Sequence, residues 1–203
     1  QAVPGLFEAT TYGADAQPVQ GQGGRGAAWF VRGEFGEGVL RHYRRGGWMA
    51  KVSTDAYLWL GEKHVRSLRE FELLRALNAA SLPVPVPLAA FFRRRGLACR
   101  AAILIERIAQ ARPFAEIVRL QAAQAPWAAV GAAIARCHRQ RAHHADLNAN
   151  NILVGPQQKA WPIDWDKGCI EPDVGGWCGS VLDRLRRSLR KECPGLAESE
   201  LDA

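Results

Sequence analysis

Hydrophobic positions repeat at helical spacing in three segments of the chain. From Lys63 to Ala80, apolar side chains fall three or four positions apart, which predicts a helix with one buried face. The same period predicts helices over Ala125–Arg141 and Gly176–Glu192. The proline-rich segment Leu82–Leu88 ends the first helix, because proline has no amide hydrogen to donate and favours an extended path.

Short apolar runs bounded by glycine and proline predict strands. They are expected at Ala27–Arg32, Val39–Tyr43, Leu88–Phe92, Ala101–Ile105, Ile152–Val154 and Ala160–Ile163. A turn is expected at Gly36–Gly38, and the polar stretch up to about Gln20 gives few signals of regular structure. The pattern predicts an α+β protein with two lobes: a small β-rich lobe with one helix, residues 1–108, and a reduced, mainly helical lobe, residues 109–203.

The composition is that of a soluble globular protein, but the charge balance is basic. Hydrophobic residues make up 48% and charged residues 23% of the chain, and the formal net charge is +7. A positive balance favours an anionic partner, such as nucleic acid, an acidic lipid surface or a phosphorylated substrate. The chain has five cysteines without CxxC spacing, so neither a disulfide framework nor a zinc site is expected.

The strongest chemical signal is the segment His144–Asn151, which has the form H-x-D-x-x-x-x-N of a kinase catalytic loop. Phosphoryl transfer needs a carboxylate that orients the acceptor hydroxyl and takes its proton, and Asp146 fits that role. It also needs oxygen ligands for a metal ion, and Asn151 fits that one. We expect His144 to support the loop rather than act as the base. The alternative is a polar loop in which these residues only form turns.

A second acidic segment follows at the end of an apolar strand. Asp164 lies 18 residues after Asp146, where kinases place a metal-binding aspartate, so we expect it to be catalytic and to bind the metal with Asn151. Asp166 comes two positions later. It either assists the metal or the substrate, or it is a surface carboxylate that pairs with Lys167.

Two features upstream could bind the nucleotide. Arg41 lies on a predicted strand at the position where protein kinases carry a phosphate-binding lysine, with Glu70 as its expected helix partner and Glu72 as the alternate. Arg41 could instead be an ordinary surface residue. A glycine cluster precedes that strand and is either a phosphate-covering loop or a plain flexible loop; its members are Gly21, Gly23, Gly24 and Gly26.

Taken together, the residues resemble the 3-deoxy-D-manno-octulosonic acid (Kdo) kinase family of Gram-negative lipopolysaccharide assembly. The resemblance covers about residues 21–192, and its most specific part is Arg41-His-Tyr-Arg-Arg-Gly-Gly47. The other segments that carry it are Arg66–Leu74, Leu82–Pro87, His144–Asn151 and Ile163–Gly168. It implies a protein-kinase-like fold, the use of ATP and Mg²⁺, and phosphorylation of the 4-hydroxyl of Kdo on a Kdo-lipid A precursor.

The resemblance further implies a peripheral enzyme at the cytoplasmic face of the inner membrane. We expect no nucleic acid and no obligate protein partner. Basic residues could attract its anionic acceptor and membrane: Arg41, Arg44, Arg45, Lys51 and Arg93–Arg95. The last predicted helix adds Arg184, Arg186, Arg187, Arg190 and Lys191 opposite its apolar stripe. That helix either lies on the membrane or packs on its own lobe with its basic face in water.

Three alternatives remain open at this point. One is a kinase-like phosphotransferase with another acceptor, such as a protein or an aminoglycoside, although the basic charge argues against a cationic acceptor. Another is a non-catalytic nucleotide-binding or lipid-binding pseudokinase, which the missing lysine suggests and Asp146, Asn151 and Asp164 oppose. The third is a basic nucleic-acid-binding module, but the chain lacks a recognition-helix pattern.

Overall fold

The computed structural model describes residues 4–19, 28–43, 57–58, 61–96 and 98–196. Contacts divide the chain into two compact units, residues 1–75 with 86–107 and residues 76–85 with 108–203. The segment Ala76–Pro85, which the sequence places in the first lobe, groups with the second unit. The assignment of lobes to functions stays a prediction, and each unit is described by itself.

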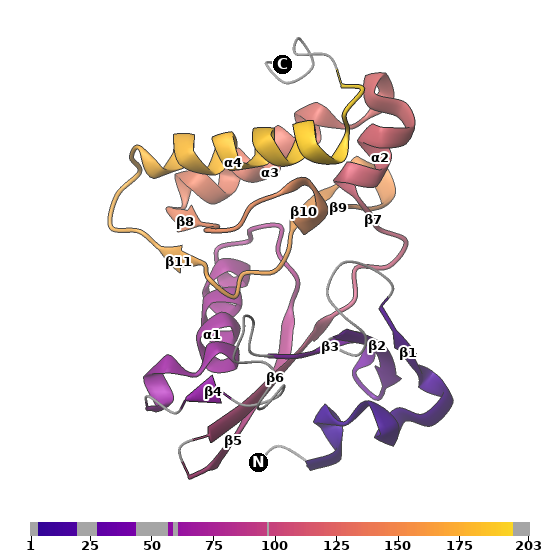
Figure 1. Ribbon diagram of the computed structural model, residues 1–203, viewed down its shortest axis with the longest axis vertical. Coiled ribbons are helices and arrows are strands. Elements are labelled where there is room, and N and C mark those ends of the chain that lie inside the picture. Colours follow the sequence, from indigo (N-terminus) through magenta and orange to yellow (C-terminus); the bar gives the residue numbers. More distant parts are fainter. Residues whose placement is uncertain (1–3, 20–27, 44–56, 59–60, 97, 197–203) are drawn as a thin grey trace. The chain divides into compact units, whose positions relative to one another are not determined.

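The first unit is built on one antiparallel sheet (Figure 1). Its strands run in the order β1-β2-β3-β6-β4, and β5 pairs with the other edge of β6. They are β1 (Ala16–Pro18), β2 (Ala28–Gly33), β3 (Gly36–His42), β4 (Tyr57–Leu58), β5 (Pro87–Arg95) and β6 (Ala98–Glu106). The four strands predicted in this unit are therefore confirmed, with ends that differ by a few residues.

The turn between β2 and β3 differs from the prediction. Gly33 pairs with Gly36, so the chain reverses at Glu34 and Phe35 and not at Gly36–Gly38. Gly36 has a φ of +89°, which glycine adopts without strain. Gly38 already lies in β3, where an added Cβ would come within 2.9 Å of both the Leu104 and the Phe35 side chains. Gly36 thus permits the tight turn, and Gly38 leaves room for the side chains that pack against β3.

The N-terminal stretch packs against the sheet, although its sequence gives few regular signals. Two 3-10 helices, η1 (Pro4–Phe7) and η2 (Ala9–Asp15), lead into β1. Phe7 is buried, and its ring stacks on that of Phe91 with centroids 5.2 Å apart. It joins a cluster with Val31, Leu40, Ala102 and Leu104. One aromatic side chain therefore anchors a polar segment that pattern analysis leaves unassigned.

The first long helix, α1 (Arg66–Ala79), follows a 3-10 turn, η4 (Glu62–His64). Its buried face is partly polar, because Ser67 and Glu70 are buried while Leu68 and Phe71 are only half-buried. The Ser67 hydroxyl donates to the carbonyl of Phe91 in β5 at 2.9 Å. Val65, Leu74 and Leu77 are buried as the helical spacing predicts, so the expected apolar face is partly correct. Hydrogen bonding offsets the cost of burying the two polar side chains beside it.

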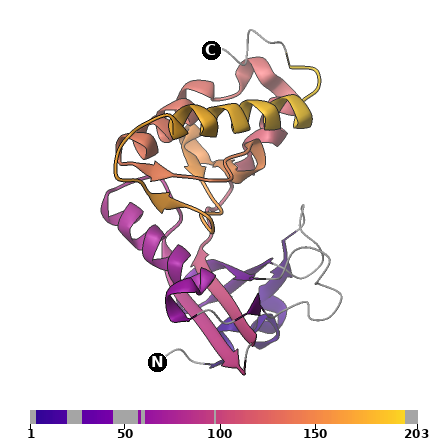
Figure 2. The ribbon, with the colours of Figure 1, turned by 60° about the vertical axis from the view of Figure 1, so that its left-hand side comes forward.

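The second unit packs helices over small sheets (Figures 1 and 2). Its helices are α2 (Phe114–Gln121), α3 (Trp127–Arg139) and α4 (Trp177–Glu192), with 3-10 turns η5 (Ala122–Gln124), η6 (Ala149–Asn151) and η7 (Pro156–Gln158). One sheet has the order β10-β9-β7 (Ala160–Pro162, Ile152–Val154, Arg112–Pro113), and the other pairs β11 (Cys169–Ile170) with β8 (Ala142–His143). Both predicted strands and both predicted helices are confirmed, whereas α2 is an addition.

One apolar core holds this unit together. Val181, Leu185 and Leu189 of α4 are buried in it with residues of α2, α3, β9 and β10. The apolar stripe of α4 therefore packs on its own lobe, and contact of its basic face with a membrane stays a prediction. Among the described residues, no helix is long and apolar enough to cross a bilayer. The chain as a whole is an α+β protein.

Candidate active site

His144 holds the two acidic segments of the second unit together. Its side chain is buried, and Nε2 lies 2.8 Å from the carbonyl oxygen of Ile163 while Nδ1 lies 3.3 Å from the amide nitrogen of Asp146. A carbonyl can only accept and an amide can only donate, so Nε2 carries the hydrogen and the ring is neutral. Burial lowers the pKa of His144, which agrees with this assignment. His144 thus has the supporting role expected of it.

Asn148 shapes the candidate catalytic loop between Asp146 and Asn151. As the N-cap of η6, its Oδ1 accepts from the amides of Asn150 and Asn151 at 3.0 and 3.1 Å. The side-chain nitrogens of Asn148 and Asn151 each donate to the carbonyl of Asp146 at 3.1 Å. The side-chain nitrogen of Asn151 is therefore bonded within the loop, which leaves its side-chain oxygen Oδ1 as the atom that can bind a cation.

Asp164 lies two residues after β10, the strand that pairs with β9 just beyond this loop. The amide of Ile163 donates to the carbonyl of Asn151 at 2.9 Å, which ties the two segments at the backbone. Asp164 has a φ of +64°, a left-handed conformation that aspartate tolerates better than most residues. The Trp165 side chain is buried, and its Nε1 donates to the carbonyl of Pro162 at 2.9 Å. Asp164 itself is half-buried.

Asp166 is half-buried and Lys167 is exposed. Both interpretations of Asp166, as an assistant at the metal or substrate and as a surface carboxylate, stay open.

Arg184 of α4 forms an ion pair with Asp146, the candidate base. Its Nη1 donates to Oδ1 of Asp146 at 2.9 Å, and both side chains are about half exposed, at 48% and 44%. The same helix also supports the loop, because the Ser188 hydroxyl accepts from the amide of Ala149 at 3.1 Å. The sequence does not predict Arg184 as a site residue, only as part of the basic face of the last helix. It lies 38 positions from Asp146, without any local motif.

In the first unit, Arg41 and Glu70 form an ion pair that the sequence anticipates. The guanidinium of Arg41 and the hydroxyl of Tyr43 both donate to Oε2 of Glu70, whose side chain is 1% exposed. The side chain of Arg41 is 21% exposed, so this residue is not a plain surface arginine. Glu72 is exposed and pairs with Arg75 at 3.7 Å. Glu70, and not Glu72, is therefore the helix partner.

Part of the predicted site lies outside the described residues. This applies to the whole glycine cluster: Gly21, Gly23, Gly24 and Gly26. It also applies to Arg44, Arg45 and Lys51.

Comparisons with known proteins identify close relatives. Residues 11–201 match the family model described as lipopolysaccharide kinase (Kdo/WaaP) family. The 3-deoxy-D-manno-octulosonic acid kinase of Stenotrophomonas maltophilia (strain K279a) is 50% identical over 191 residues, which are 94% of this chain and 76% of that protein. The protein of the same name from Xanthomonas campestris pv. campestris (strain B100) is 48% identical with the same coverage of both chains.

A solved structure supports the fold. The structure titled WaaP in complex with acyl carrier protein matches 91% of this chain and 74% of its own chain, with a TM-score of 0.57 and 16% sequence identity. At this identity the likeness concerns the fold alone. It agrees with the kinase-like α+β architecture expected from the sequence.

Proposed function

Because the chain belongs to the lipopolysaccharide kinase (Kdo/WaaP) family, we propose that it transfers the γ-phosphoryl group of ATP to the 4-hydroxyl of Kdo on a Kdo-lipid A precursor. One observation carries this proposal. His144 forms hydrogen bonds to both segments that hold Asp146, Asn151 and Asp164. These are the residue types that phosphoryl transfer by a kinase requires.

Asp146 would be the general base. In the transfer, the acceptor hydroxyl gives its proton to an Asp146 carboxylate oxygen, its oxygen forms the new bond to phosphorus, and ADP leaves with the electron pair of the broken bond. The Asp146 backbone is held by Asn148 and Asn151, and its carboxylate receives the hydrogen bond from Arg184. These contacts would keep the base oriented before the acceptor arrives, which lowers the entropic cost of reaching the reactive geometry.

The oxygen atoms of this loop fit a magnesium ion. Mg²⁺ prefers carboxylate and carbonyl oxygens, and Asn151 Oδ1 with the Asp164 carboxylate provides both on segments joined by the Ile163–Asn151 hydrogen bond. Asp166 would be a third ligand. When bound, such an ion would offset negative charge on the nucleotide phosphates.

Arg41 would supply the phosphate-binding cation in the first unit. Kinases use a lysine–glutamate pair for this purpose, and here Arg41 is paired with the buried Glu70. Tyr43 gives Glu70 a second donor, which would fix the carboxylate and thereby the guanidinium. The glycine cluster would cover the phosphates. On this proposal residues 1–108 form the nucleotide-binding lobe and residues 109–203 the catalytic lobe of a two-lobed kinase.

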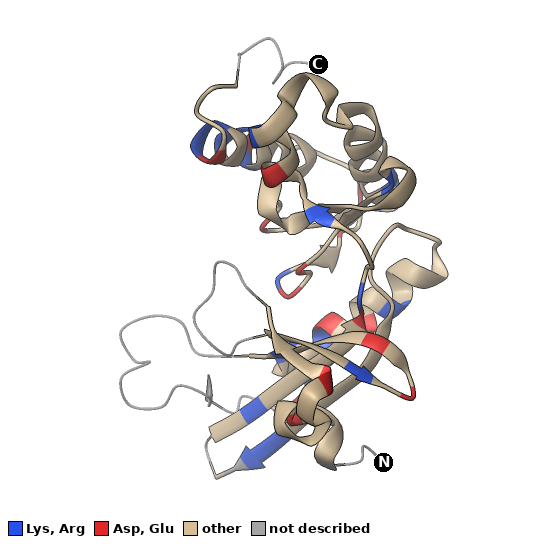
Figure 3. Ribbon diagram, turned by 90° about the vertical axis from the view of Figure 1, so that its right-hand side faces the viewer, with Lys and Arg blue, Asp and Glu red and all other residues tan. Residues whose placement is uncertain are grey.

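The acceptor and the membrane would be recognised through charge. Basic residues occur over both units (Figure 3). Exposed examples are Arg93, Arg94, Arg187, Arg190 and Lys191. A phosphorylated glycolipid in an anionic leaflet would be attracted to them, and this attraction would weaken at high salt. We therefore place the enzyme peripherally at the cytoplasmic face of the inner membrane.

A three-acceptor assay tests the proposal. The purified chain is incubated with ATP, Mg²⁺ and either a Kdo-lipid A precursor, the same precursor without Kdo, or an unrelated basic protein, and the products are analysed by mass spectrometry. We expect the mass of one phosphate to be added only to the Kdo-containing lipid. Transfer to the Kdo-free lipid or to the protein would refute the assignment of the acceptor.

A further inference from the structure

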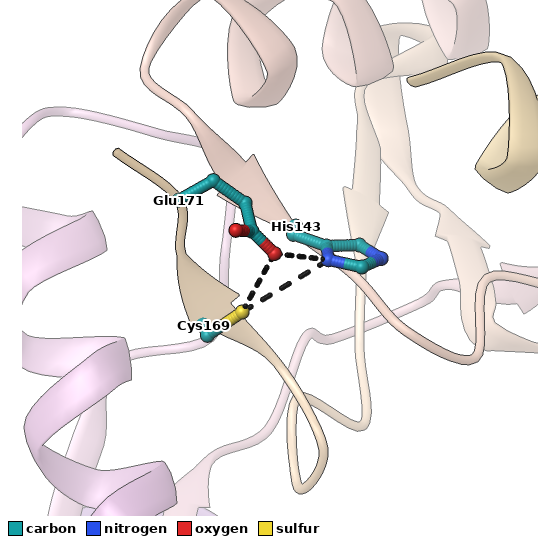
Figure 4. A group of neighbouring side chains, drawn as sticks. All are labelled: His143, Cys169 and Glu171. Atoms are coloured by element: carbon teal, nitrogen blue, oxygen red, sulfur yellow. Dashed lines mark hydrogen bonds and ion pairs between the residues drawn. The ribbon is translucent and has the colours of Figure 1, made fainter. Parts of the chain in front are cut away.

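A second group of potential ligands lies on the β8–β11 sheet, in the second unit (Figure 4). His143 in β8 pairs across the sheet with Cys169 in β11, and Glu171 follows two positions later. His143 Nδ1 lies 2.7 Å from Glu171 Oε1, Cys169 Sγ lies 3.3 Å from the same oxygen, and Sγ lies 3.9 Å from Nδ1. Three different ligand atoms therefore converge on one point.

We propose that His143, Cys169 and Glu171 bind a zinc ion. Tetrahedral Zn²⁺ with ordinary bond lengths separates such ligand atoms by about 3.4 Å for nitrogen and oxygen and about 3.6 Å for the pairs with sulfur. The three distances in the structure differ from these by about 0.3 to 0.7 Å. Small side-chain rotations would make that adjustment without moving the paired strands.

The hydrogen bonds within the group show how a cation would enter. Glu171 Oε1 accepts from both the His143 Nδ1–H and the Cys169 thiol. Zn²⁺ would replace both hydrogens. The thiol proton would leave to water, and a neutral imidazole would keep its one hydrogen on Nε2, which points away from the other two side chains in Figure 4.

The ligand types distinguish this site from the proposed magnesium site. Thiolate and imidazole suit Zn²⁺, whereas Mg²⁺ prefers oxygen alone. All three residues are half-buried, so an ion can enter and a water molecule can complete the coordination. The His143 ring stacks on Trp177 with centroids 4.9 Å apart and 29° between the planes, which would hold it in orientation.

A nucleophilic triad does not account for the same three residues. In such a triad, one ring nitrogen of histidine takes the proton of the nucleophile while the other is oriented by a carboxylate. Here the same nitrogen, Nδ1, faces both Cys169 and Glu171. His143 therefore cannot relay a proton between them, and metal binding is the chemistry that this convergence favours.

A bound zinc ion would join the two segments of the candidate active site. β8 runs directly into the loop that carries Asp146, and β11 directly follows the segment that carries Asp164 and Asp166. The ion would add a strong link to the backbone pairing of β8 with β11. Local cysteine spacing does not predict this site, because Cys169 and His143 lie 26 positions apart and meet only through strand pairing.

The test uses cobalt as a spectroscopic substitute for zinc in the full chain, after metal removal with a chelator. Bound at this site, Co²⁺ will show a near-ultraviolet sulfur-to-cobalt charge-transfer band, and one equivalent of Zn²⁺ will abolish it. Cys169→Ser will lose the band. Cys178→Ser, which changes a half-buried cysteine outside the group, will retain it.

Glu171→Gln supplies a variant that keeps the thiol and changes little in size. It will retain the charge-transfer band but lower the affinity for Zn²⁺ on the order of tenfold or more. Zn²⁺ will also raise the melting temperature of the wild type more than that of Cys169→Ser. Absence of a band in the wild type, or equal Zn²⁺ affinity in the wild type and Cys169→Ser, would overturn the proposal. None of these measurements depends on kinase activity.

Discussion

At the residue scale, Asp146, the candidate base, is held by hydrogen bonds to both its backbone and its side chain. Asp146 presents its backbone carbonyl to two asparagine side chains and its carboxylate to Arg184. The aspartate and the asparagines belong to one local segment, and the kinase motif predicts Asp146 and Asn151 from sequence alone. Arg184 could not be found that way, because it reaches the site only through the packing of α4.

Asp146→Asn will leave the fold and ATP binding nearly unchanged but reduce turnover by roughly 10²–10⁴-fold, because an amide cannot accept the hydroxyl proton. Asp183→Asn is the matched control, since Asp183 is an exposed aspartate on the adjacent helix. Steady-state kinetics and calorimetric ATP titration will measure the two effects. Near wild-type turnover in Asp146→Asn would remove this residue from the catalytic role.

At the element scale, buried polar side chains join secondary-structure elements in both units. His144 links the candidate catalytic loop to Ile163, just after β10, and Glu70 links α1 to β3. Hydrophobic periodicity predicts that α1 forms and roughly where it ends. It does not predict that Ser67 and Glu70 face inward, because their burial depends on partners in β5 and next to β3. The helix period was therefore correct, but the buried face was partly wrong.

The loop that His144 supports will weaken in mild acid. Burial holds the pKa of His144 below the ordinary histidine value, so between the two values the unfolded chain binds a proton that the folded chain does not. The free energy of unfolding will fall as pH drops below about 6.5, by up to about 1.4 kcal/mol per pH unit, and will be insensitive to this group above that pH.

Urea denaturation at about pH 7.5 and about pH 5.5 measures this effect in the wild type and in His144→Gln. The variant will be less stable at the higher pH by about 1–3 kcal/mol, because a buried hydrogen-bond network is broken. It will lose less stability on acidification. The pKa of His138 is also lowered by burial and then by His143, but His138 is present in both proteins, so their difference isolates His144. An identical acid response in the two proteins would contradict the assignment.

The Arg41–Glu70 pair will show its role through nucleotide kinetics. Arg41→Ala will raise the Michaelis constant for ATP or lower turnover, and Arg41→Lys will recover part of the loss, because lysine supplies the charge without the planar fork. Glu70→Gln will act in the same direction, whereas Glu72→Gln, which changes an exposed side chain, will be close to wild type.

Varying each substrate in turn separates the two possible ligands of Arg41. A defect confined to the lipid acceptor, with unchanged ATP parameters, would reassign Arg41 to acceptor binding.

At the scale of the whole molecule, the α+β class and most long elements could be predicted. The N-terminal 3-10 segment and α2 could not. The first depends on Phe7, whose burial against Val31 and Phe91 requires the folded sheet. The short α2 follows Pro113 directly and buries Phe114, Ala115 and Val118, a signal too brief for periodicity to separate from a strand. Both elements depend on contacts between residues far apart in the sequence, which local patterns do not reveal.

The most direct measurement of the central claim is the position of the transferred phosphate. The product of the wild-type enzyme with ATP, Mg²⁺ and a Kdo-lipid A precursor can be analysed by phosphorus–proton correlation nuclear magnetic resonance, with Asp146→Asn as the inactive control. The account predicts a single new phosphate correlated with the proton on carbon 4 of Kdo. A phosphate at any other position of the lipid would contradict it. So would a lipid that stays unphosphorylated after incubation with correctly folded wild-type protein.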